Sequence, residues 1–319
     1  MLELNAAEAA KTLLSQDNIL ILTHRNPDGD TLGSAYALLR ALLSAGKTAG
    51  VLCADEIPQK YAYMWAGLPA LQFEPQFITA VDIADEKLLG ASVEAAFGGK
   101  VDLCIDHHMS NTKYAKSLFL AESAATCELI WAVLQEMGTA LTPEIADCLY
   151  TGLSTDTGCF RYSNVTAETM EIAAKMLRAG ANFDTINRVM FETKTRTYLK
   201  LEELVLKSLE MYFGGKCALV TITQEMFRES GSNESECDGI ASLPRKIEGV
   251  LIGVTLRERT DGTFKVSLRT YAPLDAAKIC GKLGGGGHAR AAGCELNGDS
   301  LTTEKQRLLD VIQTELENI

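Results

Sequence analysis

The chain has 319 residues, 47% of them apolar, and a formal net charge of −12. A chain of this length can bury a large core and has room for two domains. Its acidic charge disfavours binding to long duplex nucleic acid, which proteins recognise through a basic stripe. A small anionic ligand stays compatible with the charge, because bound divalent cations would offset part of it.

No feature of the sequence indicates a membrane or a secreted protein. A run of about 18 apolar residues is missing, so we expect no membrane span and no membrane partner. The first residues, MLELN, lack the basic-then-apolar pattern of a secretory leader. The nine cysteines are scattered without a C-x-x-C pair, as is typical of reduced thiols. We therefore expect a cytoplasmic protein, and the sequence leaves a homodimer open.

The first part of the chain alternates apolar runs with stretches of helical spacing. Residues 18–23 (NILILT) are nearly all apolar, as expected of a strand that is buried on both faces. Helical spacing follows over residues 30–45 and ends at Gly46. Further strands are predicted at 47–53, 76–81 and 101–105, and helices at 125–137, 143–153 and 167–179. This alternation predicts an α/β fold with a mostly parallel sheet flanked by helices, whose ligands bind beyond the carboxyl ends of the strands.

The second part predicts a smaller α/β domain. A charged helix is expected over residues 193–212, ending before Gly214 and Gly215. Strands are expected at 217–223, 250–258, 264–271 and 291–296, and helices at 275–283 and from 302 onward. Asp261 and Gly262 predict a hairpin turn between two of the strands. The expected organisation is a first domain over 1–192, a helical linker over 193–214 and a second domain over 215–319.

Histidine and aspartate cluster where the first predicted strand ends. His24, Asp28 and Asp30 lie within one short loop, and Pro27 and Gly29 bend the chain between them. One interpretation is a helix cap by Asp28 or Asp30 beside an incidental histidine. The other is a metal site, because imidazole and carboxylate are ligands that Mn and Zn accept.

Three more clusters follow strand or helix ends. The first holds Asp82 and Asp85; we prefer Asp82, which directly follows a strand, as the functional residue. In the second, Asp106 precedes the tandem His107 and His108, a pattern without a common structural role. The third is Thr155-Asp156-Thr157-Gly158, which ends a helical stretch. Together with His24, Asp28 and Asp30, these residues predict two divalent ions roughly 3.5–4 Å apart, an arrangement used for phosphoryl displacement.

A glycine run marks the second domain. Gly284, Gly285, Gly286 and Gly287 lack side chains, so their N–H groups can approach an anion, and His288 adds a donor. No Lys-Ser pair follows the glycines, which disfavours an ATP site. A flexible hinge is the alternative interpretation.

These motifs together resemble one family. NPDGD after His24, DHH at 106–108, TDTG at 155–158 and GGGGH at 284–288 resemble the DHH phosphoesterase superfamily with a DHHA1 domain. The size is similar to that of the stand-alone nanoRNase/pAp-phosphatase branch (NrnA-like). The resemblance implies hydrolysis of short RNA or DNA oligonucleotides, dinucleotides or 3′-phosphoadenosine 5′-phosphate (pAp) by an activated hydroxide. Alternatives are a cyclic-dinucleotide phosphodiesterase, a family II inorganic pyrophosphatase and a non-catalytic nucleotide-binding sensor.

The resemblance also implies roles for single residues. His24 and Asp28 would bind one metal ion, Asp30, His107 and Asp156 the other, and Asp82 would bridge them. The family usually uses Mn²⁺; Mg²⁺ and Co²⁺ are the alternatives. Asp106 would orient the site, and His108 would stabilise the phosphate charge or protonate the leaving oxygen. The substrate-binding residues implied are Arg269, Gly285, Gly286, Gly287 and His288, where Thr270 replaces the serine of the family's SLRS pattern.

Overall fold

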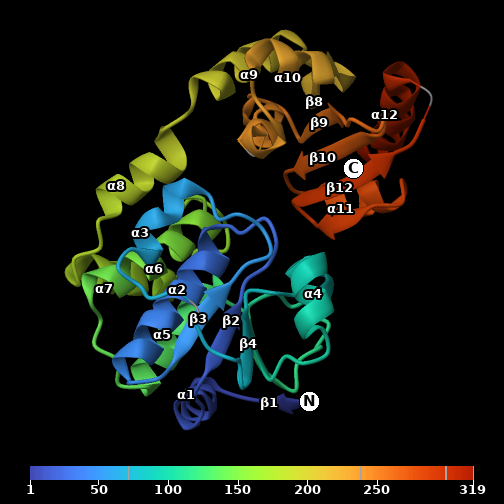
Figure 1. Cartoon of the computed structure of the whole chain (residues 1–319). Coiled ribbons are helices and arrows are strands. Elements are labelled where there is room, and N and C mark those ends of the chain that lie inside the picture. The colour runs from blue at the N-terminus through green and yellow to red at the C-terminus, as the bar shows by residue number, and fades with distance from the viewer. Residues whose placement is uncertain (71, 238, 299, 319) are drawn as a thin grey trace. The chain divides into compact units, whose positions relative to one another are not determined.

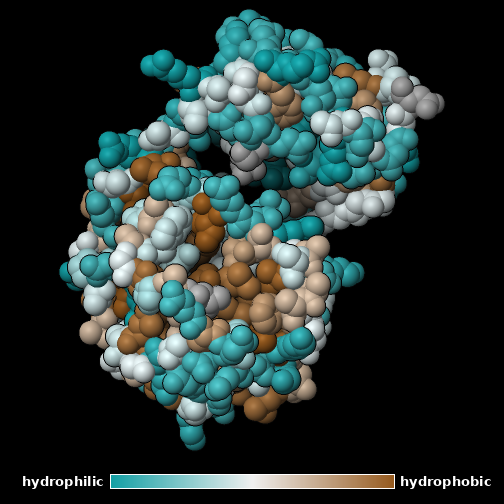
Figure 2. All heavy atoms as spheres, viewed as in Figure 1, coloured by the Kyte–Doolittle hydropathy of each residue, from teal (hydrophilic) through white to brown (hydrophobic). Residues whose placement is uncertain are grey.

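The computed structural model describes residues 1–70, 72–237, 239–298 and 300–318. The chain divides into two compact units, Met1–Thr193 and Lys194–Ile319 (Figure 1). On the visible face, hydrophilic residues dominate the second unit, whereas apolar residues gather over part of the first (Figure 2). No helix in the described ranges is long and apolar enough to cross a membrane. The expected boundaries at 192/193 and 214/215 stay predictions.

The first unit is built on a parallel six-stranded sheet, which confirms the predicted fold class. Its strand order is β1-β6-β5-β4-β2-β3, and every neighbouring pair is parallel. The strands are β1 (Leu2–Glu3), β2 (Ile19–Leu22), β3 (Ala49–Leu52), β4 (Phe77–Val81), β5 (Leu103–Asp106) and β6 (Ser117–Leu120). Every residue of β2, β4 and β5 is buried, which explains why these strands are almost entirely apolar.

Helices cover this sheet (Figure 1). They are α1 (Ala6–Ser15), α2 (Gly29–Ser44), α3 (Ala62–Trp65), α4 (Ala91–Phe97), α5 (Thr126–Glu136), α6 (Pro143–Asp156), α7 (Ala167–Arg178) and α8 (Phe183–Asn187), with short turns η1 (Gln59–Tyr61), η2 (Glu86–Leu89) and η3 (Arg188–Glu192). α2 and α6 approach closely at Gly33, where an added Cβ would lie 2.4 Å from the carbonyl oxygen of Cys148. A second close approach, where a Cβ on Gly29 would lie 2.3 Å from Oγ1 of Thr155, brings the start of α2 to the end of α6.

The second unit contains a mixed sheet of order β11-β12-β10-β9-β8-β7. The pair β8–β9 is parallel and the other pairs are antiparallel. The strands are β7 (Glu210–Tyr212), β8 (Cys217–Ile222), β9 (Ile252–Glu258), β10 (Phe264–Thr270), β11 (Gly286–His288) and β12 (Ala291–Leu296). The helices are α9 (Arg196–Lys207), α10 (Gln224–Ser230), α11 (Ala276–Gly281) and α12 (Leu301–Glu317), with short turns η4 (Phe213–Gly215), η5 (Glu234–Glu236), η6 (Ile240–Ser242) and η7 (Pro244–Lys246).

One sequence-based expectation for this unit is wrong in part. The charged helix does not continue to Tyr212: α9 ends at Lys207, and residues 210–212 form β7 because their backbone pairs with β8. α9 also buries Leu201 and Val205 in one cluster with Val220 of β8, so it belongs to the core of the second unit. Within the glycine run, residues 286–288 form the edge strand β11, which pairs with β12.

Candidate metal centre

The sheet of the first unit brings the His/Asp motifs to one edge. His24 follows β2, Asp82 directly follows β4, and His107 directly follows β5. These three strands are parallel neighbours, so their carboxyl ends lie side by side. Asp82 has φ of +60°, a left-handed conformation that is unusual for a residue with a side chain. The ends of these strands therefore bring His24, Asp82 and His107, which belong to three separate motifs, close together.

Helices α2 and α6 bring the other carboxylates. Asp28 caps α2 by accepting hydrogen bonds from the N–H groups of Asp30 and Thr31, so the helix-cap interpretation is right for Asp28. Asp30 is fully buried, and its two oxygens accept the N–H groups of Thr126 and Cys127 at the start of α5, at 2.6 and 2.9 Å. Asp156 is the last residue of α6. A cap and a ligand are thus compatible roles at Asp28.

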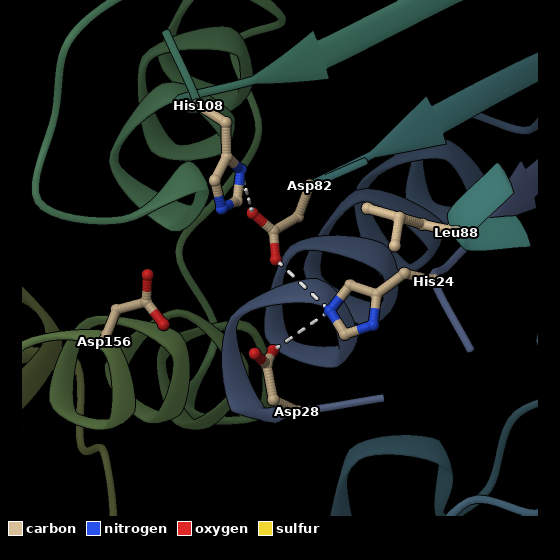
Figure 3. A pocket seen from close by; sticks show the side chains of 6 residues that line it. All are labelled: His24, Asp28, Asp82, Leu88, His108 and Asp156. Atoms are coloured by element: carbon tan, nitrogen blue, oxygen red, sulfur yellow. Dashed lines mark ion pairs between the residues drawn. The ribbon is translucent and has the colours of Figure 1, made fainter. Parts of the chain in front are cut away.

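Asp82 lies at the middle of the cluster. Its Oδ2 is 3.7 Å from Nε2 of His24, and its Oδ1 is 3.6 Å from Nε2 of His107 (Figure 3 shows the His24 contact). His24 Nε2 is also 3.6 Å from Asp28, and His107 Nε2 is 3.4 Å from Asp156. Potential ligand atoms lie within 4.8 Å of one another in three sets: His24, Asp28 and Asp82; Asp30, His107 and Asp156; and Asp82, His107 and His108.

The tautomers of His24 and His107 suit metal binding. Nδ1 of His24 donates to the carbonyl of Arg25 at 2.8 Å, and Nδ1 of His107 donates to the carbonyl of Ser123 at 3.1 Å. A proton on Nδ1 leaves a lone pair on Nε2, the atom that faces the carboxylates in both residues. Nε2 of His107 is buried and has no hydrogen-bond partner. A buried nitrogen of this kind fits a bound metal ion.

The electrostatics of the cluster also fit bound cations. Burial, together with the charges of Asp30 and Asp28, raises the pKa of Asp82 well above its usual range. Burial and the same two neighbours raise the pKa of Asp156 in the same way. Several carboxylates share this space, and the repulsion among them disfavours their ionised forms. Divalent ions would remove that repulsion, and the residues present therefore fit two of them.

His108 lies 3.6 Å from Oδ1 of Asp82, as His107 does, but its hydrogen bond goes to Asp106 (Figure 3 shows the Asp82 contact). Its Nδ1 donates to Asp106 at 2.8 Å, and this hydrogen bond raises the pKa of His108. Asp106 is fully buried and its other oxygen accepts the amide of Asn111 at 2.7 Å. Burial alone would raise the pKa of Asp106, but the hydrogen bonds from His108 and Asn111 hold it below its usual value. Asp106 therefore orients His108 and not His107, whose Nε2 faces Asp82 and Asp156.

These side chains line a pocket of about 220 Å³. Its walls are His24, Asp28, Asp82, Leu88, His108 and Asp156 (Figure 3). The other candidate of the second motif, Asp85, instead caps η2 by accepting the N–H group of Lys87, and it does not line this pocket. Three residues at the site were not predicted from the sequence: Leu88, Asn111 and Thr126, whose hydroxyl donates to Asp82 at 2.9 Å. No motif marks these three residues.

In the second unit, the register of the sheet aligns Arg269 with His288. Arg269 on β10 pairs with Ala291 on β12, and Ala291 pairs with His288 on β11. Residues paired across strands point to the same face, so Arg269 and His288 flank the small side chain of Ala291 on one face. The core-facing residues of β10 alternate with Arg269, so this face is the one turned away from α11 and its core. His288 is exposed and Arg269 half-buried.

The glycines have distinct roles in holding β11. A Cβ on Gly285 would lie 2.2 Å from the carbonyl oxygen of Gly293, and one on Gly287 would lie 2.6 Å from Cα of Ala292. Both positions therefore require glycine. Gly286 is exposed and has no atom within 4 Å of an added Cβ. Because β11 is an edge strand, the N–H groups on its outer side do not pair with another strand of this sheet.

Known proteins match this chain over nearly its whole length. The DHH family, N-terminal domain, matches residues 18–153, and the DHHA1 domain matches residues 214–318. The chain is 33% identical over 308 residues to the bifunctional oligoribonuclease and PAP phosphatase NrnA of Thermus thermophilus, covering 93% of this chain and 90% of that protein. The Bacillus subtilis protein of the same name is 24% identical over 295 residues, covering 91% and 92%.

A solved structure agrees in fold. The exopolyphosphatase-related protein from Bacteroides fragilis superposes with a TM-score of 0.85 and 25% identity, covering 98% of this chain and 96% of that one. DHH proteins depend on metal ions, which matches the His/Asp cluster of the first unit. The chain belongs to the DHH/DHHA1 phosphoesterase family and is a hydrolase of that family, related to NrnA.

Proposed function

We propose that this phosphoesterase hydrolyses short oligonucleotides, including nanoRNA and dinucleotides, to mononucleotides, and pAp to AMP. One observation carries the proposal: the carboxylate of Asp82 faces Nε2 of His24 with one oxygen and Nε2 of His107 with the other. A carboxylate in this position suits a bridge between two ions. The NrnA relatives, which match along nearly their whole length and are named as oligoribonucleases and PAP phosphatases, support the choice of substrate.

The ligand assignment is part of the proposal. His24 and Asp28 hold one divalent ion, and Asp82 bridges it to a second, held by Asp30, His107 and Asp156. The mixed imidazole and carboxylate ligands favour Mn²⁺, with Mg²⁺ and Co²⁺ as alternatives. Such ions supply a nucleophile at neutral pH by lowering the pKa of water, and they neutralise charge on the phosphate.

His108 is the proposed proton donor. Figure 3 shows its ring directed into the pocket. The hydrogen bond to Asp106 fixes Nδ1 of this ring. The raised pKa of His108 keeps the ring protonated to a higher pH than usual. The ring can then stabilise charge on the phosphate or protonate the leaving oxygen.

The second unit is proposed to bind the nucleotide. Arg269 and His288 present donors on one face, and the exposed residues Gly286 and Gly287 precede His288 on the edge strand β11. The N–H group of Gly285 instead donates to the carbonyl of Cys280 at 2.9 Å. Guanidinium and backbone N–H groups both suit phosphate. These contacts would position the substrate and leave the chemistry to the first unit.

A product time course tests the proposal. The full chain with Mn²⁺ is given pAp, pApA, a 5-mer RNA, a 24-mer RNA, cyclic dinucleotides and inorganic pyrophosphate. We expect AMP and mononucleotides from pAp, pApA and the 5-mer, with little action on the 24-mer and pyrophosphate. Turnover of cyclic dinucleotides alone, or of pyrophosphate alone, would contradict the proposal.

A further inference from the structure

The pocket at the metal centre has one apolar wall. Five of its six lining residues are histidine or aspartate, and the sixth is Leu88. Leu88 is 37% exposed, whereas the next residue, Leu89, is fully buried in the core. Figure 3 shows the Leu88 side chain beside His24 and across the pocket from Asp156. An apolar surface therefore faces a space that is otherwise lined by ionisable groups.

Hydrogen bonds hold Leu88 in this place. Its N–H group donates to the carbonyl of Asp85 at 2.8 Å, and its carbonyl accepts the N–H group of Arg25 at 2.7 Å. Arg25 follows His24 directly, so Leu88 is tied to the loop that carries a candidate metal ligand. Gly90 has φ of +82°, which lets the chain turn sharply after Leu89. These contacts fix the backbone of Leu88, so its side chain is a fixed part of the pocket wall.

An apolar wall favours ligands that carry a carbon skeleton over purely inorganic ligands. A phosphate group satisfies the cations and donors of the pocket but cannot use an apolar surface. The sugar or base that carries the phosphate can cover that surface and gain from its removal from water. Inorganic phosphate and pyrophosphate have no carbon and gain nothing from it.

We propose that Leu88 is a specificity-determining residue. It packs against the sugar or base of the nucleotide whose phosphate lies at the metal centre, and so favours nucleotides over inorganic phosphates. This inference rests on the proposed function, because it takes a nucleotide as the substrate. It adds a contact in the first unit, separate from the nucleotide-binding residues proposed for the second.

Binding of the product AMP and of orthophosphate to the Mn²⁺-loaded full chain tests the inference. Calorimetry compares the wild type with Leu88→Ala, Leu88→Met and the control Leu177→Ala, which removes a leucine of similar exposure (40%) from α7. About a third of the Leu88 surface is exposed, so Leu88→Ala should weaken AMP binding by about two- to fivefold. Orthophosphate binding should not change. Leu88→Met keeps the apolar surface and should bind AMP nearly as the wild type does, as should Leu177→Ala.

Kinetics with pApA give a second readout. Leu88→Ala should raise KM by a similar factor with kcat little changed, because the contact binds substrate and transition state alike. Equal weakening of AMP and orthophosphate binding, or no weakening of AMP binding, would overturn the role of Leu88, as would a wild type that binds AMP no better than orthophosphate. A wild type that hydrolyses neither pAp nor pApA would instead refute the proposed function, and the binding comparison would still decide the role of Leu88.

Discussion

The substitution Asp82→Asn tests the metal centre with little change in shape. Asp82 is 3% exposed, and the asparagine amide keeps an oxygen that can accept the hydroxyl of Thr126, now at 2.9 Å from Asp82 Oδ1. The substitution removes one negative charge from a group of buried carboxylates that repel one another. The metal-free variant should therefore be as stable as the metal-free wild type, or more stable.

The loss should show only when metal is added. At an ion concentration of about 100 times Kd, binding stabilises a protein by about 2.7 kcal/mol. For a unit the size of Met1–Thr193, this corresponds to roughly 5–10 °C in melting temperature. We expect Mn²⁺ to raise the melting temperature of the wild type by about this amount and that of Asp82→Asn by much less. Turnover of pApA should fall by more than about 100-fold, since losing a group that only orients a ligand already costs roughly 10–100-fold.

Asp85→Asn is the matched control for this experiment. Asp85 lies three residues further along the same segment and caps η2. Its replacement should leave the Mn²⁺-induced shift and the turnover near wild type, because asparagine is also a good helix cap. Differential scanning fluorimetry and a pApA assay measure both quantities. An Asp82→Asn protein with the full Mn²⁺ shift and full turnover would refute the bridging role of Asp82.

The other predictions concern substrate binding, His108, the pH dependence of stability and the glycine run. His288→Ala should cripple hydrolysis of pAp and short RNA but leave the metal content near wild type and cost far less activity on an aryl phosphodiester; equal losses on both substrate types would contradict this role. Asp106→Asn should lower the pKa of His108, so the alkaline limb of the pH–kcat profile should move to lower pH; an unmoved limb would count against His108 as the acid. The raised pKa of Asp82 means that the metal-free fold binds a proton more tightly than the unfolded chain does, so the stability of the metal-free protein should fall as pH rises above 3.8 toward the raised value. The stabilisation by Mn²⁺ requires the ionised carboxylate, so it should shrink as pH falls. Melting curves across pH, with and without Mn²⁺, measure both trends. Gly285→Ala should lower the melting temperature of the second unit, since its Cβ would meet backbone at 2.2 Å, and an unchanged melting curve would show that β11 can shift.

Sequence patterns predicted the elements that follow one clear period. The apolar run at 18–23 and the helical spacing at 30–45 correspond to β2 and α2 within one or two residues. The sequence did not predict β1, which has only two residues, or β6, whose first and last residues are only partly buried. The helix expected up to Tyr212 was too long, since pairing with β8 outweighs the helical preference of a few residues. The local periodicity of a sequence does not show which strands pair across the sheet.

For the candidate site, residue type was more informative than position. Histidine and aspartate at strand ends indicated which loops would meet, because parallel strands end at one edge. The sequence could not assign the partner of each imidazole: Asp106 was expected to orient the site as a whole, and the structure shows it bonded to His108. Leu88 and Asn111 act through contacts that depend on how η2 and the loop after β5 pack, so no motif could reveal them.

The number and position of bound ions test the central claim most directly. Anomalous diffraction at the Mn edge from crystals grown with Mn²⁺ would locate each ion without assumptions about ligands. We expect two peaks, roughly 3.5–4 Å apart, with Asp82 in contact with both, His24 at one and His107 at the other. A single peak, or two peaks that do not share Asp82, would contradict the two-ion centre.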